Sequence, residues 1–84
     1  MAIPAWKEPV TVFAGRHGAT RWLVGDPAKA LEVLTRHWPK HAVPGPAHRA
    51  ACNACLDAVM GRGDADAARE AFVRAAEEAD ILAP

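Results

Sequence analysis

The chain has no serine, no net charge at neutral pH and only two cysteines among its 84 residues. The absence of serine excludes any mechanism that uses a serine nucleophile. Two cysteines three positions apart form no disulfide framework, so a reducing compartment is expected. No apolar run approaches the roughly 20 residues that span a bilayer, and the first residues lack the basic and apolar regions of a secretory signal. The chain is therefore expected to be cytoplasmic, with no membrane partner.

Large apolar side chains are also scarce. Alanine supplies 20 of the 43 hydrophobic residues, which leaves 23 larger ones to build a core. At about 25 cal/mol per Å2 of buried apolar area, such a core roughly cancels the entropy lost when the chain becomes ordered. With room for one domain, residues 1–84, we expect a monomer of marginal stability. Self-association is a natural remedy for that instability.

Two short stretches near the N-terminus have the alternation that is typical of strands. Residues 7–13 and residues 19–24 both carry apolar side chains on both faces. The glycine-rich segment between them, residues 14–18, predicts a turn. Pro9 cannot donate a hydrogen bond to a sheet, so it belongs at a strand start or at an edge. A hairpin alone is marginal in water, so we expect helices on one face and a partner as a candidate cover for the other.

Three helices are expected after the hairpin. Asp26 and Pro27 form a strong helix start, because the aspartate caps free N–H groups and the proline fixes φ at the first helical position. Asp64 is expected to cap the third helix in the same way. The helices are expected over residues 27–38, 46–60 and 65–79. The expected fold class is therefore α+β, an N-terminal β-hairpin followed by three helices.

The apolar stripe of each helix predicts which face it turns inward. Beyond the third helix, Ile81 and Leu82 are expected either to fold back on the core or to add a short C-terminal edge strand. The expected inward residues of the three helices are, in chain order, Ala30, Leu31, Val33, Leu34 and Trp38, then Cys52, Cys55, Leu56 and Val59, then Ala68, Phe72, Ala75, Ala76 and Ala79.

Core positions, turn residues and helix ends follow one another along nearly the whole chain in the order of a known family. These residues are Trp6, Pro9-Val10-Thr11-Val12, Gly15, Gly18, Ala30-Leu31, Leu34, Trp38-Pro39, Cys55-Leu56-Asp57-Ala58, Gly61, Ala68-Arg69, Ala71-Phe72, Ala75-Ala76 and Glu78-Ala79. In this order they resemble small alphaproteobacterial proteins catalogued as domain of unknown function 982. The resemblance implies a β-hairpin plus helices in a free-standing protein. It carries over no activity, catalytic residue or ligand.

Cys52 and Cys55 form a CxxC motif inside the second expected helix. A redox CxxC places its first thiol at a helix N-terminus, where the dipole lowers its pKa, so this position favours core packing instead. A metal site would use His48, Cys52 and Cys55, which share a helical face at spacings of four and three. Structural zinc takes four ligands, and the fourth would be His37 or His41. Core packing is the preferred interpretation, and a metal or redox site is one alternative.

The most cationic stretch runs from residue 36 to residue 49, with no acidic residue between Glu32 and Asp57. Clusters of this kind beside an aromatic side chain can hold phosphate or nucleic acid. A helix C-terminus also attracts cations through its dipole, and the chain as a whole is neutral. Anion or nucleic-acid binding is therefore a further alternative. Its candidate contacts are Arg36, His37, Lys40, His41, His48 and Arg49.

The second strand is the better edge for pairing with another chain. It has no proline and a single charge, whereas Pro9 blunts the start of the first strand. Two copies would join across a two-fold axis into a four-stranded sheet with Trp22 near the seam. In the other arrangement, Ile81 and Leu82 cover this edge within one chain. The candidate dimer edge comprises Arg21, Trp22, Leu23 and Val24.

The charges are distributed unevenly along the chain. Residues 1–50 hold seven Lys or Arg against three acids, and residues 51–84 hold three against seven, so the two parts carry +4 and −4. Opposite charges of this kind can steer two copies together. With no catalytic constellation in view, the leading hypothesis is a non-enzymatic protein that acts by association as a homodimer, without a cofactor or a bound metal.

Overall fold

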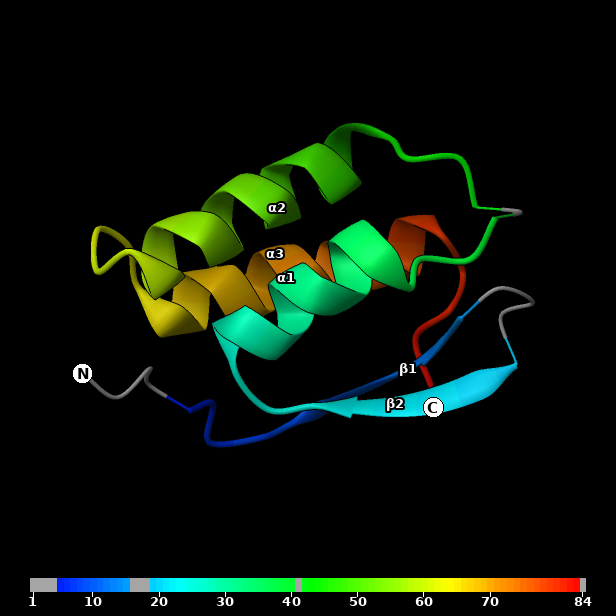
Figure 1. Cartoon of the computed structure of the whole chain (residues 1–84), viewed down its shortest axis with the longest axis horizontal. Helices are drawn as coiled ribbons and strands as arrows, with labels where there is room; N and C mark the ends of the chain where they lie inside the picture. The colour runs from blue at the N-terminus through cyan, green and yellow to red at the C-terminus, as the bar shows by residue number, and fades with distance from the viewer. Residues whose placement is uncertain (1–4, 16–18, 41, 84) are drawn as a thin grey trace.

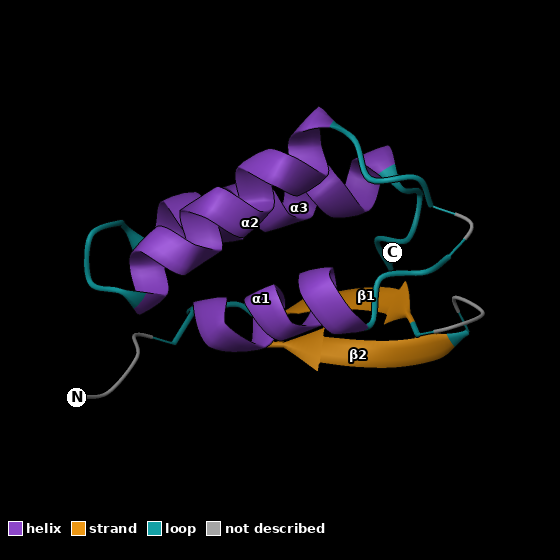
Figure 2. Cartoon of the chain, turned by 45° about the horizontal axis from the view of Figure 1, so that its top comes forward, coloured by secondary structure: helices purple, strands orange, loops and turns teal. Residues whose placement is uncertain are grey.

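The first two elements are antiparallel strands that form a hairpin. The three helices that follow all lie on one side of this hairpin (Figures 1 and 2). The computed structural model describes residues 5–15, 19–40 and 42–83. The α+β class and the order of the elements confirm the prediction. The elements are β1 (Val10–Ala14), β2 (Thr20–Val24), α1 (Pro27–Arg36), α2 (Pro46–Val59) and α3 (Ala65–Glu78).

Alternation along the strands divides the sheet into an inner and an outer face. Val10, Val12 and Ala14 of β1 are buried against the helices, and Val24 of β2 is fully buried as well. The intervening side chains of both strands point away from the helices, and the exposed fraction of Leu23 reaches 67%. Neither strand begins as early as expected: β1 starts directly after Pro9, which has no N–H for the ladder.

The C-terminal tail returns to the sheet after α3. Asp80 adopts a φ of 57°, a left-handed conformation that turns the chain back from the helix. Ile81 is then buried in the core, and Leu82 forms an antiparallel bridge with Val12 of β1. The tail therefore folds back on the core, and at the sheet edge it forms a single bridge in place of the strand that was the other expectation. The edge that the tail covers is the edge of β1, so the prediction that it could cover β2 is wrong.

The starts of the helices are fixed in two different ways. Asp26 caps α1, because its carboxylate accepts a hydrogen bond of 2.7 Å from the Lys29 N–H. Asp64 caps α3 through the Asp66 N–H at 3.3 Å. Both caps confirm the prediction. α2 begins after Gly45, which has no side chain to act as a cap, so its first N–H groups need an acceptor from elsewhere.

The inward face of α2 differs from the predicted one. Ala51, Cys55 and Ala58 are buried, whereas Leu56 is 43% exposed. Cys52 and Val59 are only half-buried. The small side chains of Ala51, Cys55 and Ala58 allow α2 to pack closely with this stripe facing the core. Relative to the predicted face, the helix is rotated about its axis, and Leu56 is therefore exposed. The prediction that Leu56 lies in the core is therefore wrong.

α1 and α3 follow their predicted faces more closely. In α1, Ala30, Val33 and Leu34 are buried, Leu31 is half-buried, and the helix ends before the half-buried Trp38. The buried residues of α3 are Ala68, Phe72, Ala75 and Ala76, and Ala79 packs at its end.

The ring of Phe72 lies at the centre of the core and is fully buried. Its centroid is 5.9 Å from that of Trp6 and 6.3 Å from that of Trp38. Aromatic pairs at these distances add to the stability gained from burial alone. Phe72 therefore joins the start of the chain to the segment that follows α1.

Candidate functional site

In the described part of the chain, the tail occupies the outer edge of β1, whereas the outer edge of β2 is open. The Phe13 N–H donates to the Ile81 carbonyl at 2.8 Å, and the Ala83 N–H donates to the Thr11 carbonyl at 3.0 Å. No described residue pairs with β2 on the side away from β1. An edge of this kind is a template for pairing with another chain.

The register of the hairpin identifies which main-chain groups face that open edge. Thr11 and Phe13 direct their groups at the tail, so the alternate residues of β1 must direct theirs at β2. Their partners are Val24, Trp22 and Thr20, opposite Val10, Val12 and Ala14. The remaining residues of β2, Arg21 and Leu23, therefore point their N–H and C=O groups outward.

The four residues predicted to form the edge do not all lie on the same face. Arg21 and Leu23 are exposed on the outer face of the sheet, Val24 is buried, and Trp22 is half-buried on the inner side. The Arg21 guanidinium lies 5.5 Å from the centre of the Phe13 ring. This cation–π contact holds the arginine stem along the outer face instead of leaving it free in solvent.

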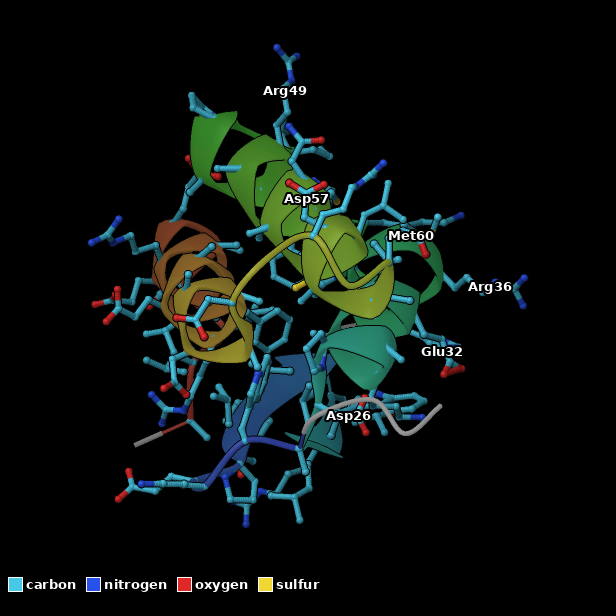
Figure 3. The ribbon with its side chains drawn as sticks, turned by 90° about the vertical axis from the view of Figure 1, so that its left-hand side faces the viewer. Asp26, Glu32, Arg36, Arg49, Asp57 and Met60 are labelled. Atoms are coloured by element: carbon cyan, nitrogen blue, oxygen red, sulfur yellow. The ribbon has the colours of Figure 1, made fainter. Side chains whose placement is uncertain are left out.

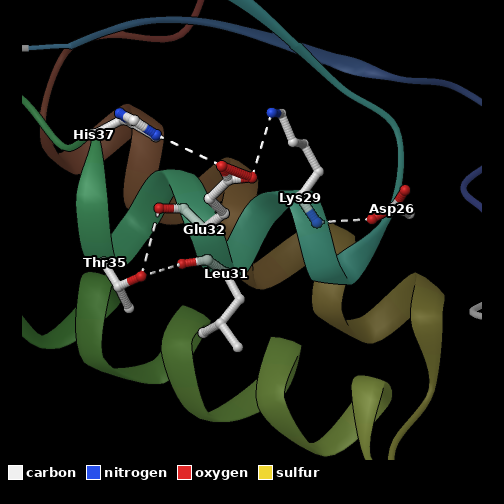
Figure 4. A network of polar contacts seen from close by, with 6 residues as sticks. All are labelled: Asp26, Lys29, Leu31, Glu32, Thr35 and His37. Carbon is white, nitrogen blue, oxygen red and sulfur yellow. Dashed lines mark hydrogen bonds and ion pairs between the residues drawn. The ribbon is translucent and has the colours of Figure 1, made fainter.

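Two residues of the first helix and its cap contact Trp22: Lys29 of α1 and His37, the C-cap of α1. The His37 ring stacks on it with centroids 4.5 Å apart, and Lys29 Nζ lies 4.6 Å from the ring centre. Glu32 contacts both residues, with one carboxylate oxygen 3.4 Å from Lys29 Nζ and the other 3.6 Å from His37 Nε2 (Figure 4). The hydrogen bond from Lys29 and its charge lower the pKa of Glu32, and His37 adds to the effect.

The indole N–H of Trp22 is buried and has no hydrogen-bond partner among the described residues. Buried donors normally find an acceptor, so the inner side of the β2 edge is incompletely satisfied. Trp6 has the same feature deeper in the core. Nothing in the sequence indicated either of these orphan donors.

His48 and Cys52 lie together, but Cys55 is turned away from them. His48 Nε2 is 2.9 Å from the Leu34 carbonyl oxygen, which only accepts, so Nε2 carries a proton. Cys52 Sγ lies 3.8 Å from the other ring nitrogen, Nδ1. Cys55 Sγ instead faces the Ala68 carbonyl of α3 at 4.0 Å. The three residues expected as metal ligands therefore do not converge.

The two thiols are free and in the protonated form that burial favours. Burial raises the pKa of Cys52, and burial together with the neighbouring Cys52 raises the pKa of Cys55 to about 12. A nucleophilic or metal-binding cysteine needs the opposite shift. Across residues 5–15, 19–40 and 42–83, no three His, Cys, Asp or Glu side chains are placed to share a metal ion.

The cationic residues of positions 36–49 are dispersed over several elements. Arg36 and Arg49 point away from the molecule in different directions, from α1 and from α2 (Figure 3). Lys40 is exposed, whereas His37 is stacked on Trp22 and His48 bonds to a main-chain carbonyl. His41 lies outside the described residues. The described residues of this group do not form one patch.

The start of α2, which lies inside the cationic stretch, already holds a carboxylate. Glu78 at the end of α3 accepts hydrogen bonds from the N–H groups of Ala47, at 3.2 Å, and His48, at 3.4 Å. A Cβ at Gly45 would lie within 2.8 Å of that carboxylate, so glycine leaves room for it. Glu78 is thus a cap supplied from 30 residues away, and no local motif could have indicated it.

An apolar strip remains uncovered between α1 and α2. Leu56 of α2 is 43% exposed, and Met60, the C-cap of α2, is 61% exposed. A shallow groove of about 340 Å3 lies beside them, and Leu31, Thr35 and Val59 help to line it. Sequence reasoning missed this strip because it placed Leu56 and Val59 in the core. Leu56 and Met60 are the exposed large hydrophobic side chains of the described helices and their caps.

Comparison with known proteins places the chain in one family. Residues 8–83 match the family described as Protein of unknown function (DUF982). The chain belongs to the DUF982 family. The family named by the resemblance is thereby confirmed, and the description of the family names no activity. Searches of the curated proteins and of the solved structures gave no match for this DUF982 protein. No helix in its described part has both the length and the hydropathy to cross a bilayer.

Proposed function

We propose that this DUF982 protein acts by self-association, as a homodimer in which the β2 strands of two copies pair at their open edges. The supporting observation is the difference between the two edges of the sheet. The tail hydrogen-bonds to β1, whereas Arg21 and Leu23 of β2 direct their main-chain groups outward without a described partner. Pairing across a two-fold axis would give these main-chain groups hydrogen-bond partners and join the two hairpins into one four-stranded sheet.

The proposal includes no catalysis and no bound cofactor. The His48–Cys52 pair has a thiol whose pKa is raised, so the sulfur is poorly suited to act as a nucleophile. We further propose that the protein works in the cytoplasm, where both free cysteines would stay reduced. Anion binding remains a hypothesis that no contact among the described residues favours over self-association.

Sedimentation velocity of the wild type and of Leu23→Pro tests this proposal. The Leu23 N–H faces the open edge, so proline removes a donor between chains while leaving the hydrogen bonds of the hairpin intact. We expect the wild type to be dimeric at micromolar concentration and Leu23→Pro to be a folded monomer. Leu23→Ala is the matched control, because it removes the same side chain and keeps the N–H.

Two outcomes would contradict the proposal in different ways. A wild type that remains monomeric at high micromolar concentration would rule out the homodimer. A Leu23→Pro protein that is folded by circular dichroism and still dimeric would place the interface elsewhere. The exposed strip of Leu56 and Met60 would then be the next surface to test.

A further inference from the structure

The open edge of β2 is short enough for its possible pairings to be compared one by one. Only Arg21 and Leu23 present outward main-chain groups within the strand, one N–H and one C=O each. Two copies of β2 related by a two-fold axis must run antiparallel to one another. Three registers then bring outward-facing residues opposite each other: Arg21 with Arg21, Leu23 with Leu23, or Arg21 with Leu23 of the other copy.

The first register places two like charges directly opposite each other. In a hydrogen-bonded antiparallel pair the facing Cα atoms are about 5.5 Å apart, and like charges at that position destabilise the sheet. The Arg21 side chain is already held on the outer face by the ring of Phe13. Because Phe13 lies in β1, this contact draws each guanidinium away from the seam, yet it leaves the two arginines at directly opposite positions.

The second register needs an acceptor that is already in use. If Leu23 faces Leu23, then Arg21 faces Gly25 of the other copy, one residue beyond the end of β2. The Gly25 carbonyl already accepts a hydrogen bond of 2.8 Å from the Trp6 N–H. In this register the Gly25 carbonyl would have to accept from Arg21 and from Trp6 at once, so the Arg21 N–H would share its acceptor.

The third register avoids both problems. Arg21 faces Leu23 in both halves of the seam, so the outward N–H and C=O groups of these two residues are all used. On the outer face, the stem of Arg21 would cover Leu23, which is 67% exposed in the single chain. On the inner face, Trp22 would meet its own counterpart at the two-fold axis.

We infer that a second copy of this chain pairs with β2 in the third register, with Arg21 opposite Leu23 and Trp22 opposite Trp22. This inference rests on the proposed homodimer and adds its register. The register gives the dimer a specificity device, because slipping by one pair in either direction meets the facing arginines or the occupied Gly25 carbonyl.

Disulfide cross-linking of single-cysteine additions reads out the register directly. Cα atoms of a hydrogen-bonded pair lie at a distance that a disulfide can bridge, whereas residues displaced by two positions along the strand lie too far apart. We would prepare Arg21→Cys and Leu23→Cys, with an affinity tag on one of them, and oxidise each alone and after mixing. The parent protein, with its native Cys52 and Cys55, gives the background.

The inference predicts that the mixture forms at least about fivefold more covalent dimer than either variant alone, because only unlike cysteines face each other. Cross-linking of Arg21→Cys alone, or of Leu23→Cys alone, would overturn the register while leaving an edge-to-edge dimer in place. A sedimenting dimer without cross-links in any sample would overturn both the register and the edge. A monomeric parent protein would overturn the homodimer itself and with it this inference.

Discussion

The two edges of one small sheet are protected in different ways. β1 is covered by its own chain, through the Leu82 bridge to Val12 and two hydrogen bonds to the tail. β2 has no described partner on its outer side, although it also carries apolar side chains on both faces. The helices cannot supply that partner, because they lie on the face of the sheet and not beside it (Figure 2). This difference between the described edges is the basis of the proposed dimer, because an unpaired edge can accept another strand.

The largest effect is expected from releasing the tail. Ile81 is buried with 3% of its surface exposed, so Ile81→Ala should cost about 2–5 kcal/mol of unfolding free energy. Leu82→Ala is the matched control and should cost clearly less, because Leu82 is partly exposed. Urea unfolding followed by circular dichroism measures both. Equal costs for the two variants would show that the tail does not anchor β1 through Ile81.

Proline substitutions compare the two edges directly. Phe13→Pro removes an N–H that bonds to the Ile81 carbonyl and leaves that acceptor unsatisfied, which should cost about 1–3 kcal/mol beyond Phe13→Ala. Leu23→Pro removes an N–H with no described partner and should cost much less beyond Leu23→Ala, when both are measured at concentrations low enough for monomers. If the two prolines cost the same, the edges do not differ as described.

The caps of α1 and α2 offer a smaller version of the same contrast, between a local and a distant partner. Asp26→Ala should lower the unfolding free energy by about 0.5–2 kcal/mol, and Asp26→Ser should be nearly neutral. Glu78→Ala should produce a loss of similar size, about 0.5–2 kcal/mol, although its partners lie in another helix. Thermal unfolding of the three variants provides the measurement, and a neutral Glu78→Ala would mean that solvent caps α2 equally well.

The smallest effect concerns Glu32 beside the β2 edge. Because Lys29 and His37 lower its pKa in the folded chain, its contribution to stability is present above the ordinary glutamate pKa. That contribution is lost as the pH falls through the lowered folded value. An NMR titration of the side chain should therefore show Glu32 titrating below the ordinary glutamate pKa, and Glu32→Gln should slightly flatten the acid side of the stability profile. A Glu32 that titrates at the ordinary glutamate pKa or above it would contradict the network in Figure 4.

The parts of the structure that depend on neighbouring residues could be predicted from the sequence. Several local signals are found where they were expected. They are the Asp26 cap, Pro27 at the first position of α1, and the buried alternate positions Val10 and Val12 in β1. The class of the fold follows from their order.

The parts that failed depend on long-range choices. In α2, alanines surround the helix, so hydrophobicity does not distinguish the stripe through Ala51 from the one through Leu56. Both strands carry apolar side chains on both faces, so the local sequence does not determine which edge the tail pairs with. The Glu78 cap joins residues 30 apart through a gap left by Gly45. Within the candidate edge, only the register of the hairpin identifies Arg21 and Leu23 as the residues whose main-chain groups point outward.

Amide hydrogen exchange, measured residue by residue at two protein concentrations, tests the difference between the edges most directly. The Phe13 and Ala83 amides bond within the chain, so they should be protected to the same extent in dilute and in concentrated protein. The Arg21 and Leu23 amides should exchange rapidly when the protein is dilute and become protected as the concentration rises and β2 pairs. If Arg21 and Leu23 exchange rapidly at every concentration while Phe13 stays protected, β2 does not pair and the proposed dimer edge is contradicted.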